Sequence, residues 1–128
     1  MNVAASETLR PLILICDDER PLRELVKAAL GDGYRYEEAA DTGEAEQLLA
    51  ADRPSLLVLD VMLPGKSGIE LLEELRNRPE TADIPVVIIS AWHGEYEVTA
   101  LGSGADAFLG KPFDPDELAQ TVERLIAA

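Results

Sequence analysis

Polar residues that can bind ligands or take part in a reaction stand at the ends of several apolar runs in this 128-residue chain. Asp17 and Asp18 follow the first run, Asp60 and Ser90 end the third and fourth, and Lys111 comes after the fifth. If these ends meet at one edge of a sheet, three carboxylates converge, and each favours protonation unless a cation lies between them. A hard divalent ion such as Mg²⁺ suits a few carboxylates, a carbonyl oxygen and water. The residues therefore predict a magnesium site.

An aspartate in such a place can also be phosphorylated, because a carboxylate is ionised at neutral pH and needs no general base. The transferred phosphoryl group carries charge on three oxygens, which a cation, an ammonium group, a hydroxyl and backbone N–H groups can share. Lys111 supplies an ammonium group and Ser90 a hydroxyl. The structural alternative is that the acids cap helices or face solvent, and Asp18 also fits the N-cap of the helix that follows it.

The elements that would position these residues alternate five times between a short apolar run and a helical pattern. Strands are expected at 12–16, 34–39, 56–59, 85–89 and 107–109, with a helix after each. This alternation predicts the α/β class and a (βα)5 fold, with a doubly wound, five-stranded parallel sheet covered by helices on both faces. One strand order open to such a sheet is the flavodoxin-like order 2-1-3-4-5. In that order the first and third strands are neighbours, and function lies beyond the carboxyl ends of the strands.

Two elements depart from the regular pattern. The segment 34–39 contains Arg35, Glu37 and Glu38, which suits an edge strand, where charges block stray pairing. The helix expected at about 94–101 has weak periodicity and a glycine at each end.

Composition restricts the kinds of partner. The chain has 11 Lys and Arg against 25 Asp and Glu, a net charge of −14, so nucleic acid and anionic membranes are not expected partners. The apolar content of 47% is sufficient for a core, and Cys16 has no second cysteine for a disulfide. With no membrane span or signal sequence visible, we expect a cytoplasmic domain over 11–128 after a flexible N-terminal tail over 1–10.

Four segments together carry a resemblance that none would justify alone. They are ICDDE at 15–19, LVLDVMLPG at 57–65, IISA at 88–91 and GADAFLGKPF at 104–113. The chain resembles the receiver domain of bacterial two-component response regulators over 11–128. The resemblance is to the stand-alone, single-domain type such as the chemotaxis regulator, whose strand order is also 2-1-3-4-5.

The resemblance implies a role for each site residue. Asp60 would accept the phosphoryl group. Asp17 and Asp18 would hold Mg²⁺, or Mn²⁺ in its place, together with Asp60 and the backbone carbonyl of Met62. A shared metal and phosphoacceptor site is therefore expected at Asp60.

Further roles follow for residues near the last two strands. Ser90 and Lys111 would bind phosphoryl oxygens. The Lys111–Pro112 peptide bond would be cis, which is a specific prediction because even X–Pro bonds are seldom cis. Ser90 and Phe108 would form the switch that responds to phosphorylation. Phe108 also fits a plain core aromatic on a strand.

Several positions depart from the family pattern. Ser90 stands where Thr is commoner, Phe108 stands where Tyr is commoner, and the segment between Ser90 and Lys111 is slightly short. Met62 and Trp92 lie two residues after Asp60 and Ser90, where the family tunes dephosphorylation. Their apolar bulk is expected to shield the acyl phosphate and prolong the phosphorylated state, although Trp92 also fits a packing or interface role.

We therefore expect a signalling switch rather than an enzyme. A sensor histidine kinase or a phosphotransfer protein would donate the phosphoryl group, and autodephosphorylation would be slow. Phosphorylation would shift the balance between two arrangements of the surface formed by the fourth helix, fifth strand and fifth helix. That surface would bind a downstream protein target, and the resemblance also allows a homodimer through it.

Alternatives share parts of this pattern. A pseudo-receiver, acting as a phosphorylation-independent interaction module, usually lacks an acid or the lysine, and none is missing here. A phosphatase of the haloacid dehalogenase kind expects a second aspartate at Met62. The GKS motif at 65–67 would need a glycine at Asp60 to bind nucleotide, and Asp17 and Asp18 would repel the phosphate of FMN.

Overall fold

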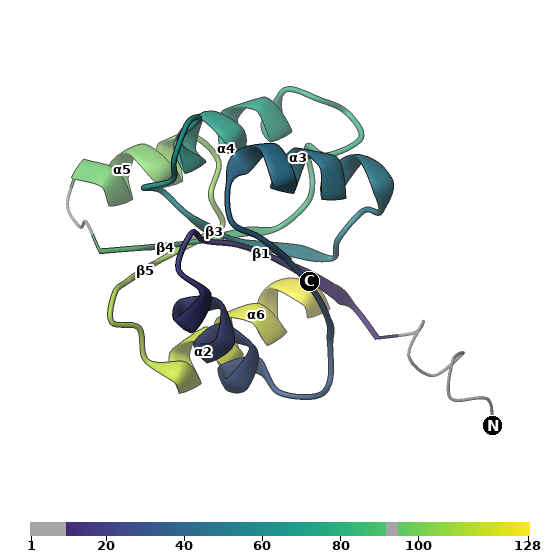
Figure 1. Cartoon of the computed structure of the whole chain (residues 1–128), viewed down its shortest axis with the longest axis vertical. Coiled ribbons are helices and arrows are strands. Elements are labelled where there is room, and N and C mark those ends of the chain that lie inside the picture. The colour runs from purple at the N-terminus through teal and green to yellow at the C-terminus, as the bar shows by residue number, and fades with distance from the viewer. Residues whose placement is uncertain (1–9, 92–94) are drawn as a thin grey trace.

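A computed structural model describes residues 10–91 and 95–128 of the chain. Within them, five strands alternate with five helices (Figure 1). They are β1 (Leu12–Cys16), α2 (Arg20–Leu30), β2 (Arg35–Ala39), α3 (Thr42–Ala51), β3 (Leu56–Asp60), α4 (Gly68–Arg76), β4 (Val86–Ser90), α5 (Glu95–Gly102), β5 (Ala107–Gly110) and α6 (Pro115–Ala127). The predicted alternation is confirmed. The predicted tail over 1–10 lies outside the described residues apart from Arg10, so its flexibility stays a prediction.

The sheet has the predicted parallel order β2-β1-β3-β4-β5. From β1 the chain adds β2 on one side of the sheet and then β3, β4 and β5 on the other, so the strand order reverses between β1 and β3. There Cys16 pairs with Leu59. The residues next along these two strands, Asp17 and Asp60, therefore emerge side by side at the carboxyl edge. This is the switch point at which open α/β sheets place their functional groups.

Helices cover both faces of the sheet, with α3, α4 and α5 on one face and α2 and α6 on the other (Figure 1). Successive residues of a strand point to opposite faces, so each strand contributes to two cores. Leu14 and Leu57 belong to the core under α3–α5, whereas Ile15 and Val58 belong to the core over α2 and α6. Burial on both faces explains why these strands are apolar throughout.

The edge position of β2 is confirmed, because β2 pairs with β1 alone and lies at the end of the sheet. Its first four residues are half-buried and Ala39 is buried. The charged residues predicted to protect the edge, Arg35, Glu37 and Glu38, lie in this half-buried stretch.

Side-chain caps begin three of the helices, at places where an Asp or Ser followed three residues later by Glu predicts a helix start. Asp41 accepts a hydrogen bond from the backbone N–H of Glu44 at 2.8 Å, and Ser67 accepts one from Glu70 at 3.2 Å. Asp114 caps α6 in the same way. These caps satisfy N–H groups that have no partner inside the helix, and so they fix where each helix starts.

Several strand boundaries differ from the expected ones by one residue. The expected N-cap of α2 and the expected start of β4 are wrong for identifiable physical reasons. The N-cap of α2 is Glu19 rather than Asp18, because the carbonyl of Glu19 accepts the first helical hydrogen bonds. Asp18 is thereby left exposed beside the other acids. In addition, β4 begins at Val86 rather than Pro85, since proline has no N–H to donate to a neighbouring strand.

No helix among the described residues combines the length and the apolar character that crossing a bilayer requires. The predicted compartment is not tested by this finding.

Gly68, the first residue of α4, lies directly against the backbone of Asp60. Its N–H donates to the carbonyl of Val61 at 3.0 Å. A Cβ at this position would collide with the backbone carbonyl oxygen of Asp60. The glycine is therefore required for space, because the first turn of α4 must approach the end of β3 this closely.

We predict that Gly68→Ala lowers the free energy of unfolding by about 1–3 kcal/mol, the usual result of forcing extra volume into a packed site. Urea denaturation followed by circular dichroism measures the change. Gly102→Ala is the matched control, because nothing lies within 4 Å of a Cβ built there. Its free energy of unfolding should not fall, because alanine is the better helix former and has room there. Equal midpoints for Gly68→Ala and the wild type would contradict the proposed close approach.

Candidate functional site

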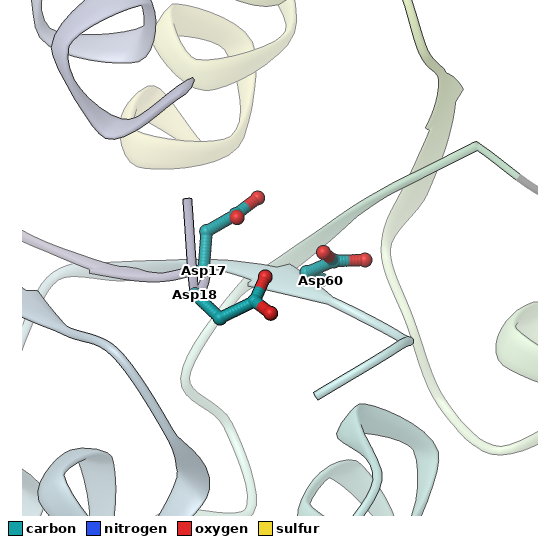
Figure 2. Close-up of side chains that lie close together, drawn as sticks. All are labelled: Asp17, Asp18 and Asp60. Carbon is teal, nitrogen blue, oxygen red and sulfur yellow. The ribbon is translucent and has the colours of Figure 1, made fainter. Parts of the chain in front are cut away.

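Three carboxylates meet at the carboxyl edge of the sheet (Figure 2). Asp17 and Asp18 follow β1, and Asp60 is the last residue of β3. One oxygen of each carboxylate lies within 4.8 Å of the others. Asp17 is 5% exposed and Asp60 is 4% exposed, whereas Asp18 is exposed. The cluster is therefore buried at its base and reaches solvent at Asp18.

Lys111 brings a positive charge into this cluster from the loop after β5. Its Nζ donates to Asp60 Oδ2 at 2.9 Å and to Asp17 Oδ2 at 3.1 Å. Its backbone N–H donates to the carbonyl of Ser90 at 2.8 Å, which ties the loop to the end of β4. The Lys111–Pro112 peptide bond is cis, as predicted.

Burial and charge shift the protonation of these groups. Burial raises the pKa of Asp17 above its ordinary value of 3.8, although a hydrogen bond from Glu19 and the charge of Lys111 oppose the change. Burial acts to lower the pKa of Lys111, but hydrogen bonding to Asp60 and the charges of both aspartates outweigh it and raise the pKa. Lys111 therefore stays protonated. Burial and the charge of Asp17 raise the pKa of the Cys16 thiol to about 12, which disfavours its reactive thiolate form.

The cluster has the donor chemistry of a hard divalent cation. Three carboxylates face a single ammonium group, so the assembled charges leave an excess of negative charge. Carboxylate oxygens are the ligands that Mg²⁺ and Mn²⁺ prefer. The backbone N–H of Met62 donates to Asp60 Oδ1 at 3.2 Å, which places the Met62 backbone beside the cluster. The predicted use of its carbonyl oxygen stays a prediction.

The remaining predicted residues occupy different environments. Ser90 is fully buried at the end of β4, whose neighbours are β3 and β5. Phe108 pairs with Ile88 and packs, half-buried, against the core under α3–α5. Phe108 is therefore a core aromatic in this state, which leaves its predicted switch role untested. The side chain of Met62 is 50% exposed, and Trp92 lies outside the described residues.

Two residues that support the site were not predicted from the sequence. Arg23 donates to the backbone carbonyl of Asp17, and Gly68 makes room for the backbone of Asp60. A glycine in the first turn of a helix is a recognisable sign of close packing, because glycine weakens a helix. Arg23 has no such sign, since an arginine one turn into a surface helix is ordinary.

Comparison with known proteins places this geometry in a family. The sequence matches the response regulator receiver domain family over residues 13–123. It is 41% identical over 117 residues to the phosphate regulon transcriptional regulatory protein PhoB of Pseudomonas aeruginosa. It is 40% identical over 116 residues to the response regulator MprA of Mycobacterium ulcerans. The alignments cover 89% of this chain but 51% of PhoB and 49% of MprA, so the chain spans about half the length of these relatives.

Solved structures agree with the sequence comparison. The receiver domain of the Francisella response regulator 1452 matches with a TM-score of 0.84 at 34% identity, covering 91% of this chain and 97% of that one. The receiver domain of NtrX from Brucella abortus matches with a TM-score of 0.82 at 36% identity, covering 91% of this chain and 98% of that one. The chain belongs to the receiver domain family of two-component response regulators, as its motifs predicted.

We predict that Asp17→Asn is more stable than the wild type at neutral pH when divalent cations are removed with EDTA. Because the folded state holds a proton on Asp17 more readily than the unfolded state, wild-type stability falls as the pH rises from 3.8 through the raised pKa. The advantage of the variant should therefore shrink as the pH drops toward 3.8. Urea denaturation over this pH range measures it.

The matched control for this prediction is Asp32→Asn, which neutralises an exposed acid in the loop between α2 and β2. This variant should follow the wild-type dependence of stability on pH. A loss of stability in Asp17→Asn at neutral pH would contradict the prediction, because it would mean that the ion pair with Lys111 outweighs the effect of burial.

Proposed function

We propose that this chain is a phosphoacceptor switch in which Mg²⁺-dependent phosphorylation of Asp60 changes a protein-interaction surface. The donor is a phosphohistidine on a sensor histidine kinase or a phosphotransfer protein. The observation that carries the proposal is the Asp60 carboxylate itself, buried beside two further acids and hydrogen-bonded to Lys111. A nucleophile, a fixed ammonium group and a cation-binding pair of acids thus surround one point.

In the proposed reaction, a carboxylate oxygen of Asp60 attacks the phosphorus of the phosphohistidine. The P–N bond breaks, its electron pair goes to the imidazole nitrogen, and that nitrogen takes up a proton from water. Lys111 would exchange its hydrogen bond to Asp60 Oδ2 for one to a phosphoryl oxygen, and the hydroxyl of Ser90 would donate to another. Asp17, Asp18 and Asp60 would hold Mg²⁺, which would supply the neutralisation of phosphoryl charge that such transfers need.

The surface beside the site suits an apolar donor helix. Leu22 and Leu25 on α2 and Phe113 after β5 line an apolar pocket of about 110 Å³, together with Pro112 and Pro115. Leu25 is 58% exposed. Both flanking segments lie next to site residues in the chain, so a partner seated on this pocket would bring its phosphohistidine to the edge that carries Asp60. We assign this surface to the phosphodonor.

We propose that the output surface is the predicted face formed by the fourth helix, fifth strand and fifth helix, which are α5, β5 and α6. Val98 and Leu101, one turn apart on α5, are 73% and 46% exposed. Apolar exposure of this kind suits contact with a downstream protein. The homodimer through the same surface stays a prediction. PhoB is named as a transcriptional regulatory protein, so an output through transcription is compatible with this switch. For the 128 residues of this chain, we propose from the net charge of −14 that they do not contact nucleic acid themselves.

The decisive experiment is intact mass spectrometry after incubation with acetyl phosphate, with Mg²⁺ or with EDTA. We expect one phosphoryl adduct that requires Mg²⁺ and is absent from Asp60→Asn. In this reaction the P–O bond of acetyl phosphate breaks and acetate leaves with the electron pair, so atoms and charge balance without a further reactant. Asp116→Asn, which changes an exposed acid of α6, is the control and should be phosphorylated like the wild type.

Other outcomes separate the alternatives. A folded wild type that binds Mg²⁺ but gains no adduct would favour the pseudo-receiver, a phosphorylation-independent interaction module. Continuous release of phosphate from small phosphate esters would contradict the proposal of a signalling switch and indicate a phosphatase. An adduct that persists in Asp60→Asn would place the phosphoacceptor elsewhere.

We further propose that Met62 prolongs the phosphorylated state. The backbone N–H of Met62 donates to Asp60 Oδ1, so this residue stands next to the phosphoacceptor, and its side chain is 50% exposed. An apolar group there hinders an attacking water, whereas an amide can bind and orient it. Met62→Asn should therefore speed dephosphorylation about tenfold, equivalent to about 1.4 kcal/mol of barrier.

Loss of phosphoprotein mass with time, after removal of acetyl phosphate, measures this rate. Met62→Leu keeps an apolar side chain of similar size and should keep the wild-type lifetime. If Met62→Asn and Met62→Leu lose the phosphoryl group equally fast, shielding by Met62 is excluded. The companion proposal for Trp92 concerns a residue outside the described part of the chain.

A further inference from the structure

Arg23 contacts the acidic site through the backbone of Asp17. This arginine lies one turn into α2, and its side chain is 14% exposed. Its Nη1 donates to the backbone carbonyl of Asp17 at 2.6 Å. The contact is short and charge-assisted, which places it among the stronger protein hydrogen bonds. It holds the peptide that joins Asp17 to Asp18.

A second contact fixes the direction of the arginine. Its Nε donates to Glu38 Oε1, on edge strand β2, at 3.0 Å. The other oxygen of Glu38 accepts from Lys27 Nζ at 2.9 Å. Hydrogen bonds from Lys27 and then Arg23 lower the pKa of Glu38, so this anchor is ionised at neutral pH. Two cations on α2 thus share one carboxylate on the edge strand.

With the contact from Arg23, each polar group of Asp17 has a hydrogen-bond partner. The backbone N–H of Asp17 donates to Ala39 at 3.0 Å, its Oδ1 accepts from Glu19 at 2.9 Å, and its Oδ2 accepts from Lys111 at 3.1 Å. The backbone carbonyl is the remaining polar group, and Arg23 binds it. Since this carbonyl belongs to the peptide that joins Asp17 to Asp18, its orientation sets the position of Asp18 relative to Asp17.

We propose that Arg23, anchored by Glu38, is a positioning residue for the cation site. It acts by aiming the carboxylates of Asp17 and Asp18 and does not bind the cation. The inference rests on the proposed function, in which those carboxylates hold Mg²⁺. Groups that orient metal ligands in this way commonly change metal affinity about 10- to 100-fold when they are removed.

Charge and positioning make opposite predictions for this residue. A nearby positive charge repels Mg²⁺, so if Arg23 acted by charge alone, its removal would strengthen Mg²⁺ binding. If Arg23 positions the ligands, its removal weakens binding despite the loss of that repulsion. The sign of the change therefore distinguishes the two roles, and a purely structural role would change the melting temperature without changing Mg²⁺ affinity.

The test is isothermal titration calorimetry of Mg²⁺ into the wild type, Arg23→Ala and Lys27→Ala, without any phosphodonor. Lys27→Ala is the matched control, because it also removes a cation of α2 that binds Glu38, but one turn further along the helix. We expect Mg²⁺ to bind Arg23→Ala about tenfold more weakly. We expect the affinity of Lys27→Ala to stay within about twofold of the wild type, or to increase slightly through lost repulsion.

Two more variants keep the test decisive if Arg23→Ala does not fold, which far-UV circular dichroism would show. Glu38→Ala removes the anchor but keeps the arginine, and it should also weaken Mg²⁺ binding. Arg23→Lys keeps the charge but lacks the planar fork that reaches Asp17 and Glu38 together, so it should not restore full affinity.

Failure of the inference and failure of the proposed function give different results. A wild type that binds no Mg²⁺ would contradict the proposed function. A wild type that binds Mg²⁺, with equal or tighter binding by Arg23→Ala, would overturn the positioning role alone. Wild-type affinity in both Glu38→Ala and Arg23→Lys would overturn it as well.

Discussion

Crowding Asp17, Asp18 and Asp60 onto one edge of the sheet is unfavourable for folding, because like charges repel and burial removes water from two of them. The surrounding structure compensates with fixed donors rather than with more solvent. Lys111 bonds two of the carboxylates, and backbone N–H groups of Glu19 and Met62 bond their remaining oxygens. The compensation is partial, since the pKa of Asp17 stays raised through burial. A cluster of this kind could hold a metal ion.

The scaffold can hold such a cluster because its strands are buried on both faces. The packed cores above and below β1 and β3 leave little freedom at the strand ends, so Asp17 and Asp60 keep their separation. The same ends connect the site to distant surfaces. Lys111 is tied to the carbonyl of Ser90, and the chain continues from Ser90 toward α5 with its exposed apolar side chains. A charge added at Asp60 would therefore act on a lysine and a strand end that lie between the site and the proposed output surface.

Much of this protein is determined locally, and the sequence by itself predicted it. Apolar runs without alternation indicate strands buried on both faces, and Asp41, Ser67 and Asp114 mark helix starts through their side-chain oxygens. Charged residues in β2 marked it as an edge. The strand order then predicted that the acids at the ends of the first and third strands lie side by side. These features were predictable because each depends on residues a few positions apart or on a strand-order rule shared by this fold class.

Tertiary structure alone decided how the side chains share the site. Lys111 donates a hydrogen bond to Asp17, 94 positions away in the sequence. Arg23, whose place in α2 gives no sign of it, donates to the backbone carbonyl of Asp17. Glu19 rather than Asp18 caps α2, and Gly68 is needed because the backbone of Asp60 approaches it. Such contacts leave no periodic pattern, because they depend on where packed elements bring atoms together in three dimensions. The sequence determined which groups reach the edge of the sheet, and only packing decided which partner each of them bonds.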